Sequence, residues 1–344
     1  MNLNIFFLFL ALIVSACQPS DSPQIDGRPD GTTAFFGQAM TMSYTILIGQ
    51  TLTSSQTTLI AQIIAQTFRD TDDIYNKWNP HSEVSRLNKQ KAGIPTPLSP
   101  LLQRLFHETD TIVRLSKGKF DPTIEPLQHL WKEKLTQGIT PTAEEIATIA
   151  PAIGWKNISF DRGVFRKNHG LTQLDFGGIA KGLCIDLLVE RLNEAGFLHT
   201  FVEWGGEIRA TGNHPEGRSW TIYISRLSDS NPEHAIATLH VDNQAVATSG
   251  DYLQNWTISK DEKQKKRSIT YFHIFDPETL HPLEATHLSV ASASVVAPNC
   301  ALADGLATIP LMFSSLEEAT QWAEKIKEEF PDLSFWMISR NMKM

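Results

Sequence analysis

The chain has 344 residues, enough for one large domain or two ordinary ones, and its 41% hydrophobic share is that of a globular protein. A formal net charge of -8 leaves no basic surplus to neutralise phosphates, so the composition excludes a nucleic-acid partner. The one basic cluster, residues 263–267, lies beside two acidic residues and fits a solvated hairpin tip better than a binding patch.

The N-terminal residues indicate a targeting segment. Residues 5–14 form an apolar run that is too short to span a bilayer and has the length of a signal-peptide core. Small residues then precede Cys17, which resembles the lipobox of bacterial lipoproteins, although the usual Lys or Arg near the start is missing. We expect a signal peptide over 1–16, a lipidated Cys17 with a flexible tether over 17–33, and a folded domain over 34–344.

Helical spacing of apolar residues marks the first half of the domain. A strand is expected over 39–48, followed by an amphipathic helix over 54–75. A second helix is expected over 100–115 with Ser99 as its N-cap, and a short third helix begins near residue 142, with Thr140 as its cap.

From residue 158 the pattern becomes rich in strands. The expected strands are 158–160, 164–166, 200–204, 220–225, 235–241, 245–248, 270–275, 287–293 and 333–338, and two helices are expected over 298–312 and 315–330. Since helices and strands are mixed without strict alternation, the pattern predicts an α+β fold rather than a doubly wound sheet. Cys184 and Cys300 stand in apolar helical contexts, so two buried thiols are expected rather than a disulfide.

The stretch from Asp175 to Gly182 is the most informative part of the sequence. It lies between a strand-like run over 171–174 and a helix-like run over 183–192. Paired glycines at such a junction let the backbone approach a bulky anion, and the N–H groups of the new helix then face it. A tight turn without a ligand fits these residues equally well.

Asp304 and Thr308 form a second candidate site. Residues at i and i+4 share one face of a helix, so the carboxylate and the hydroxyl can point the same way. Two oxygen donors suit a hard cation such as Mg²⁺, which is commonly coordinated by substrate phosphate oxygens as well as by protein oxygens. Alternatively, Thr308 bonds back to a helix carbonyl and Asp304 is a helix-start residue.

Three further residues have two interpretations each. His273, on a strand where its ring would share a face with Tyr271 and Phe275, is either a structural histidine or part of a site. Phe120 and Trp78 each either stack on a planar ligand or fill a core.

The set of motifs, taken in chain order, resembles the ApbE family of FAD:protein FMN transferases over residues 34 to 330. The motifs that carry the resemblance are Ala39–Met42, Ser82–Asn88, Gly118–Thr123, Asp175–Gly182, Trp204–Glu207, Ala247–Tyr252, His273–Pro277 and Ala303–Thr308. The resemblance implies a single large ApbE-like domain of mixed sheets with flanking helices.

The resemblance also implies the chemistry. Such an enzyme uses FAD as FMN donor with Mg²⁺, attaches FMN to a Thr or Ser hydroxyl of an acceptor flavoprotein subunit in a membrane redox complex, and releases AMP. By family position, Asp304, Thr308 and the Gly178 carbonyl would hold the metal. The residues expected to line the FAD site are Met40, Trp78, Lys119, Phe120, Asp121, Asp175, Lys181 and Ile274. Our hypothesis for the general base is His273, because a neutral imidazole accepts a proton near pH 7.

The sequence departs from the family pattern at two places. Glu278 and Leu280 stand where the family commonly has Arg and Gly, which is expected to alter the turn, and Ala307 replaces an acidic residue found in some members. Hydrolysis of FAD to FMN and AMP, or flavin binding without catalysis, remain alternatives. The lipobox predicts a membrane-anchored lipoprotein that faces the periplasm, and the family's targets favour the inner membrane.

Overall fold

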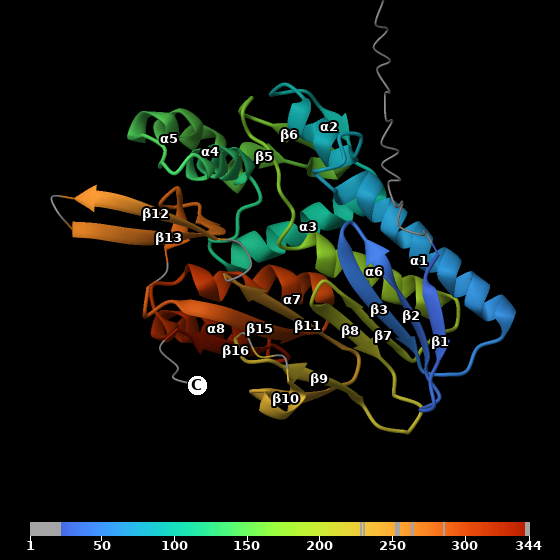
Figure 1. Ribbon diagram of the computed structural model, residues 1–344. Coiled ribbons are helices and arrows are strands. Elements are labelled where there is room, and N and C mark those ends of the chain that lie inside the picture. Colours follow the sequence, from blue (N-terminus) through green and yellow to red (C-terminus); the bar gives the residue numbers. More distant parts are fainter. Residues whose placement is uncertain are drawn as a thin grey trace, which may run out of the picture.

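An antiparallel sheet of eight strands forms the centre of the fold (Figure 1). The structure is a computed structural model that describes residues 22–227, 229, 231–251, 255–262, 265–284 and 286–340, so the predicted signal peptide and Cys17 lie outside the described residues. From one edge to the other, the sheet contains β1 (Gln24–Gly27), β2 (Thr33–Ala39), β3 (Met42–Ile48), β7 (Thr200–Trp204), β8 (Glu207–Thr211), β11 (Gln244–Gly250), β15 (Val290–Ala297) and β16 (Ser334–Ser339).

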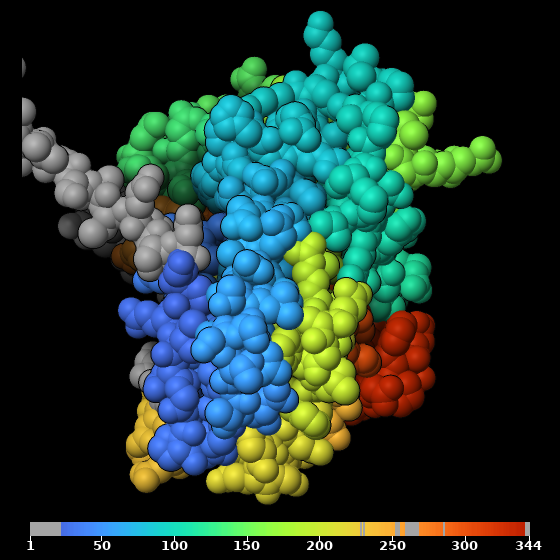
Figure 2. Space-filling view, turned by 90° about the vertical axis from the view of Figure 1, so that its right-hand side faces the viewer, coloured from blue at the N-terminus to red at the C-terminus, as the bar shows by residue number. Residues whose placement is uncertain are grey.

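A layer of helices covers one face of this sheet. The α-helices of the described residues are α1 (Ser54–Tyr75), α2 (Glu83–Lys89), α3 (Pro100–Leu115), α4 (Glu125–Thr136), α5 (Ala143–Ile149), α6 (Ala180–Glu194), α7 (Cys300–Ala307) and α8 (Leu316–Glu329). Helix α6 packs on β7 and β8, and α7 packs on β11 and β15. Figure 2 shows the outside of this layer, where α1 (light blue) lies beside α6 (yellow-green).

The main core lies between the sheet and these helices, and a short ribbon covers the opposite face. Side chains on a strand alternate between faces, so Val202 of β7 points into the main core while its neighbour Phe201 packs against Trp220 of the ribbon. The ribbon consists of β9 (Trp220–Ile224) and β10 (Ala237–Val241), which are antiparallel.

A smaller lobe stands beside the main sheet. Its hairpin of β12 (Asn255–Glu262) and β13 (Lys265–Asp276), with β14 (His281–Glu284), packs against α4 through a cluster that includes Trp131, Tyr271 and Phe275. A fourth sheet of the described residues contains β4 (Thr96–Pro97), β5 (Ile158–Ser159) and β6 (Val164–Lys167). The short 3₁₀ helices are η1 (Ala150–Ala152), η2 (Trp155–Asn157), η3 (Asp161–Gly163), η4 (Pro232–His234) and η5 (Ile309–Met312).

The α+β prediction is confirmed, and the two long N-terminal helices begin and end where the sequence placed them. Thr53 and Ser99 cap them: each side chain accepts a backbone N–H from the first turn, and Thr53 forms a full capping box with Gln56. The predicted N-cap of α5 was wrong, since Thr142, not Thr140, accepts the N–H of Glu145.

The structure differs from three local expectations. The strand expected over 39–48 is confirmed as β3 from Met42 to Ile48, but its start was wrong, because Met40 and Thr41 form the turn between β2 and β3 with φ of 47° and 70°. Residues 171–174 form one isolated bridge at Gln173 rather than a strand. The tether expected through residue 33 contains β1, whose exposed residues pair with β2 at the sheet edge.

Two helices near the site were missed. Helix α2 is a single short segment of 7 residues, and α4 begins with a Glu-Pro pair that the sequence analysis did not use.

The prediction of two buried thiols is confirmed, because Cys184 and Cys300 are both free and buried. Within the described residues, no helix is both long and apolar enough to cross a membrane.

Candidate active site

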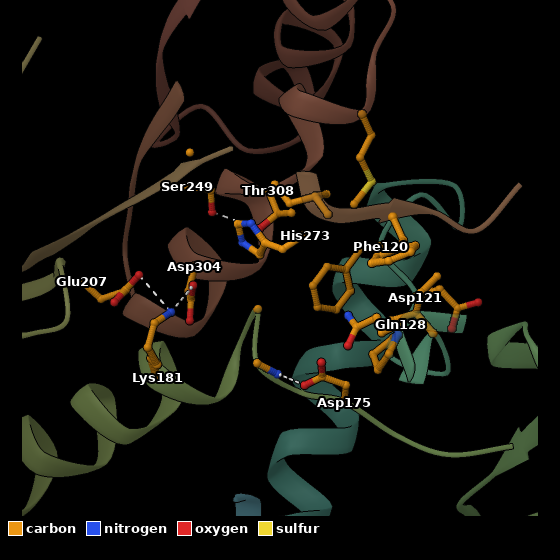
Figure 3. A pocket seen from close by; sticks show the side chains of 18 of the residues that line it. Phe120, Asp121, Gln128, Asp175, Lys181, Glu207, Ser249, His273, Asp304 and Thr308 are labelled. Carbon is orange, nitrogen blue, oxygen red and sulfur yellow. Dashed lines mark hydrogen bonds and ion pairs between the residues drawn. The ribbon is translucent and has the colours of Figure 1, made fainter. Parts of the chain in front are cut away.

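A cavity of about 540 Å³ opens where the ends of several sheet strands meet the start of α6, helix α7 and the small lobe. Its lining includes most of the residues that the sequence singled out: Trp78, Lys119, Phe120, Asp121, Asp175, Gly178, Lys181, His273, Ile274, Asp304 and Thr308 (Figure 3). Met40 is not among the lining residues, because the β2–β3 turn takes it away from the cavity and Met42 lines the wall instead.

The glycines before α6 allow three segments to come close together. A Cβ on Gly178 would lie 3.0 Å from the ring of Phe120 and 3.8 Å from the hydroxyl of Thr308. The preceding turn is fixed by Asp175, whose Oδ1 accepts the N–H of Gly177 at 2.8 Å. The backbone of this turn therefore lies between an aromatic ring and a candidate metal ligand.

Asp304 and Thr308 both face the cavity from α7, as the helical spacing predicted. Asp304 is only 2% exposed, and its Oδ2 accepts the backbone N–H of Gly182 at 3.0 Å, which fixes the carboxylate at the first turn of α6. The Thr308 hydroxyl is 3.0 Å from that of Ser249, which also lines the cavity and was not singled out by the sequence.

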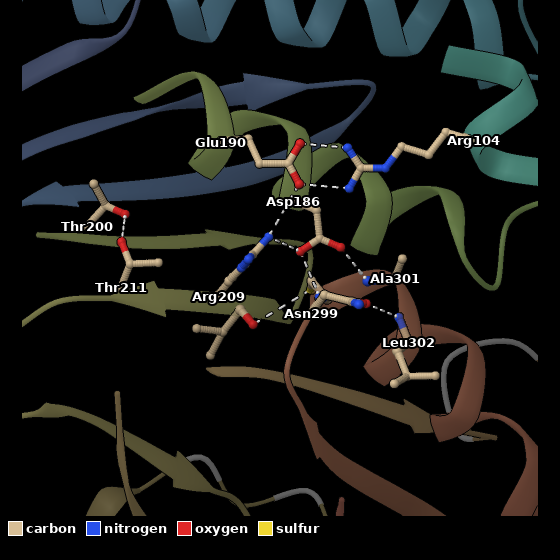
Figure 4. Close-up of polar contacts among 11 residues, drawn as sticks. Arg104, Asp186, Glu190, Thr200, Arg209, Thr211, Asn299, Ala301 and Leu302 are labelled. Carbon is tan, nitrogen blue, oxygen red and sulfur yellow. Dashed lines mark hydrogen bonds and ion pairs between the residues drawn. The ribbon is translucent and has the colours of Figure 1, made fainter. Parts of the chain in front are cut away.

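A second carboxylate joins the same two helices in the reverse direction. Asp186 of α6 accepts the N–H groups of Cys300 and Ala301 at the start of α7, both at 2.8 Å (Figure 4). Arg209 of β8 pairs with the same carboxylate at 2.6 Å. Burial raises the pKa of Asp186, although Arg209 and the two backbone donors oppose this effect. Each helix thus supplies a carboxylate to the N-terminus of the other.

Close contact between the helices accompanies these two bonds. A Cβ on Gly182 would lie 2.3 Å from the carbonyl oxygen of Cys300, so only glycine fits where α6 meets α7. The arrangement holds Asp304 and Thr308 at a fixed distance from the α6 N-terminus.

The side chain of Lys181 lies between two buried carboxylates. Its Nζ is 3.0 Å from Glu207 Oε1 and 3.3 Å from Asp304 Oδ1. Burial opposes the charge on Lys181, but the carboxylates of Asp304 and Glu207 outweigh it and raise its pKa. Burial, together with repulsion from Asp304, raises the pKa of Glu207, and the charge of Lys181 opposes this shift. The sequence analysis included Glu207 only as the last residue of the motif Trp204–Glu207.

A second lysine, Lys77, organises the opposite part of the cavity. Its Nζ bonds to Asp175 Oδ2 at 2.9 Å and also pairs with Glu125. Burial opposes its charge, yet Asp175 and Glu125 together raise the pKa of Lys77. The sequence missed Lys77 because its partners come from two other segments of the chain.

Trp78 presents its ring to solvent. It is 73% exposed, and the ammonium groups of Lys77 and Lys132 lie 4.9 and 5.5 Å from the ring centre. Phe120, in contrast, is 6% exposed and belongs to the main core while its edge lines the cavity. The core interpretation therefore applies to Phe120, and Trp78 has the free surface that a planar ligand needs.

Asp121 is held in place by its own turn. Its Oδ1 accepts the N–H of Thr123 at 2.8 Å and the hydroxyl at 2.7 Å. Burial raises the pKa of Asp121, and these bonds oppose the shift. Lys119 points across to Phe313, with its Nζ 5.1 Å from the ring centre.

His273 lines the cavity from β13, next to two residues that do the same. The pairing of β13 with β14 shifts register between Tyr271 and Phe275, so His273, Ile274 and Phe275 all border the cavity. Tyr271 and Phe275, with which His273 was expected to share a face, both belong to the cluster packed against α4, and Phe275 also borders the cavity.

Leu280 occupies the turn position where the resembling family commonly has glycine. Its φ is 59°, a left-handed conformation that costs a residue with a side chain about 1 kcal/mol or more. The carbonyl of Leu280 accepts the indole N–H of Trp131 at 3.1 Å. Leu280 therefore adopts the left-handed conformation that glycine adopts more readily.

The donors available for a metal are those that suit a hard cation. No group of three or more His, Cys, Asp or Glu side chains that could hold a metal occurs in the part of the chain that the structure describes. One carboxylate, Asp304, instead stands near the hydroxyls of Thr308 and Ser249 and the backbone at Gly178. Mg²⁺ takes one or two carboxylates and completes its shell with water and phosphate oxygens, so this set fits it.

Comparisons with known proteins identify the family of this chain. The ApbE family model matches residues 40–332. The FAD:protein FMN transferase of Chlamydia pneumoniae is 37% identical over 86% of this chain and 89% of its own length, and that of Chlamydia trachomatis is 38% identical over 85% and 88%. The apo flavinyl transferase ApbE of Pseudomonas stutzeri superimposes with a TM-score of 0.73 at 26% identity, covering 93% of this chain and 92% of its own. This chain belongs to the ApbE family.

Proposed function

We propose that this protein transfers the FMN half of FAD to a Thr or Ser hydroxyl of an acceptor flavoprotein, with Mg²⁺, and releases AMP. The observation that carries the proposal is one cavity that combines a hard-cation donor set, Asp304 and Thr308, with a histidine at its edge. The names of the relatives at 37% and 38% identity support the same activity.

In this proposal the hydroxyl oxygen of the acceptor bonds to the FMN phosphorus. The P–O bond to the AMP half breaks, AMP leaves with the electron pair, and His273 takes the hydroxyl proton. Mg²⁺ held by Asp304, Thr308 and the Gly178 carbonyl would neutralise the charge of the diphosphate. Lys181 stands beside this position and supplies a further positive charge.

The rest of the cavity would hold the two planar parts of FAD. The exposed ring of Trp78 offers a stacking surface at the mouth, and Asp175 with Lys77 forms a fixed polar wall beside it. Lys119, Asp121 and Ile274 would complete the site. Each of these contacts is a proposed role; all of these residues except Lys77, which acts through Asp175, line the cavity.

The N-terminal segment extends the proposal to location. We infer from the lipobox-like residues before Cys17 that lipid on this cysteine tethers the protein to the periplasmic side of the inner membrane. An acceptor that is itself a membrane subunit would then meet the enzyme at the same surface. Growth with radiolabelled palmitate, comparing the natural chain with Cys17→Ala, tests this inference: label in both would contradict it.

Mass spectrometry of the acceptor tests the activity. The full chain, purified in detergent, is incubated with FAD, Mg²⁺ and a candidate acceptor subunit, with the same acceptor lacking its Thr or Ser hydroxyl as control. A mass gain equal to FMN on the first acceptor alone is the expected result. Free FMN and AMP with an unmodified acceptor would instead indicate a hydrolase, and unchanged FAD would indicate a carrier.

A further inference from the structure

Glu207 is a buried residue of the cavity for which neither the fold nor the proposed chemistry gives a reason. It begins β8 directly after the Gly205–Gly206 turn, and it is 3% exposed. Its Oε1 pairs with Lys181, but its Oε2 is buried and has no hydrogen-bond partner within the described part of the chain. An unsatisfied carboxylate oxygen costs free energy, so a purely structural role does not explain this residue.

The partner of Glu207 also contacts the candidate metal ligand. In the view of Figure 3, Glu207, Lys181 and Asp304 lie together at one end of the cavity, with the ammonium group between the two carboxylates. Side-chain exposure is 24% for Lys181 but only 4% and 2% for Glu207 and Asp304. Water therefore screens these interactions weakly.

Asp304 has one oxygen to offer to a cation. Its Oδ2 is engaged by the N–H of Gly182 at 3.0 Å, and its Oδ1 faces the ammonium group of Lys181 at 3.3 Å. A divalent cation that binds Asp304 and the Lys181 ammonium group compete for the same negative charge. The Lys181 ammonium group can move away from Asp304 at little cost in free energy only if another carboxylate binds it.

We propose that Glu207 is a positioning residue that holds the Lys181 ammonium group away from Asp304 when a divalent cation binds, and so sets the affinity of the site for that cation. The inference rests on the proposed function for the position of the cation at Asp304. It needs no assumption about FAD, the acceptor or the turnover step. The turn that leads into Glu207 favours glycine at Gly205, where φ is 64° and a Cβ would lie 2.9 Å from Met42 Sδ.

A double-mutant cycle on metal binding tests the proposal. Mn²⁺ is titrated into the full chain without FAD or acceptor, and free Mn²⁺ is measured by its electron paramagnetic resonance signal. The variants are Glu207→Gln, Lys181→Met and the combination of both. We expect Glu207→Gln alone to weaken Mn²⁺ binding at least tenfold and Lys181→Met alone to tighten it, because the competing cation is gone.

The combined variant distinguishes an effect of Glu207 through Lys181 from a direct effect of Glu207 on the metal. If Glu207 acts by holding Lys181, then Glu207→Gln in the Lys181→Met background changes the Kd by less than threefold. A tenfold loss in both backgrounds would mean that Glu207 acts on the metal directly, by ligation or by its own charge, and would overturn the proposal. An unchanged Kd for Glu207→Gln alone would overturn it equally.

Controls separate this inference from the proposed function and from misfolding. Glu203→Gln removes a half-buried carboxylate from the same hairpin, one that accepts the N–H of Gly206 at 2.9 Å and does not line the cavity, and should leave the Kd within twofold. Glu207→Asp, with circular dichroism melts of each variant, replaces Glu207→Gln if that variant does not fold, and should weaken binding because the shorter chain retracts from Lys181. No Mn²⁺ binding by the natural chain at millimolar metal would overturn the inference. Mn²⁺ binding with this pattern but an unmodified acceptor would refute the proposed function alone.

Discussion

Replacing Asp186 with Ala should destabilise the protein more than any surface charge does, because this carboxylate joins two helices and a strand. It accepts two of the free N–H groups at the start of α7 and pairs with Arg209 of β8, with its side chain only 1% exposed. After the change, two backbone donors lose their acceptor, and Arg209 keeps only the more distant carboxylate of Glu190, at 3.9 Å.

The expected magnitude follows from these three contacts. Hydrogen bonds to an ionised group contribute about 1.5–3 kcal/mol each, and removing one partner of a buried ion pair costs about 3–5 kcal/mol. The two figures describe overlapping losses, so we expect about 3–5 kcal/mol for Asp186→Ala rather than their sum. Asp186→Asn keeps one acceptor oxygen but turns an NH₂ group toward the other donor, and should cost about 1–3 kcal/mol.

Urea unfolding followed by tryptophan fluorescence and by circular dichroism measures the difference, with agreement of the two probes as a check of two-state behaviour. Asp70→Ala is the matched control, since Asp70 also pairs with an arginine, Arg191, at 2.6 Å, but in a more exposed position between α1 and α6, with 23% of the Asp70 side chain accessible to water. That change should cost at most about 1 kcal/mol. If Asp186→Ala cost no more than Asp70→Ala, the joining of α6 and α7 by this carboxylate would not contribute to stability as argued here.

Three further outcomes are expected. His273→Asn should lower FMN transfer at least about a hundredfold while FAD still binds, and a rate within threefold of the natural one would rule out His273 as the base. Asp304→Ala should abolish Mg²⁺-dependent transfer, so unchanged activity at saturating Mg²⁺ would refute the ligand assignment. Gly182→Ala should cost about 1–3 kcal/mol or more in a thermal melt because its Cβ would lie 2.3 Å from the main chain of α7, whereas Gly170→Ala, with nothing within 4 Å, should be nearly neutral.

Local patterns predicted the elements whose signals lie within a single segment. The apolar spacing of α1 and the cap Ser99 of α3 are signals that lie within a few residues, so the bounds of both helices were predicted correctly. The same holds for Asp304 and Thr308, whose separation by one helical turn was enough to place both on the cavity. The start of the strand expected over 39–48 was wrong because the turn at Met40 and Thr41 lacks glycine, the usual signal of a two-residue hairpin.

The sequence by itself determined the fold class, the two long N-terminal helices, the family and most of the residues that line the cavity. Only the tertiary structure decided which of them act on one another. Lys77 meets Asp175, Lys181 meets Glu207, and Asp186 meets the start of α7 through contacts between segments far apart in the chain. The charged residues of these pairs have no periodic spacing in the sequence. Which of them pair depends on which segments the packing of the core brings together. For that physical reason the sequence placed Glu207 only at the end of a motif, and the fold alone shows that it is a buried partner of Lys181.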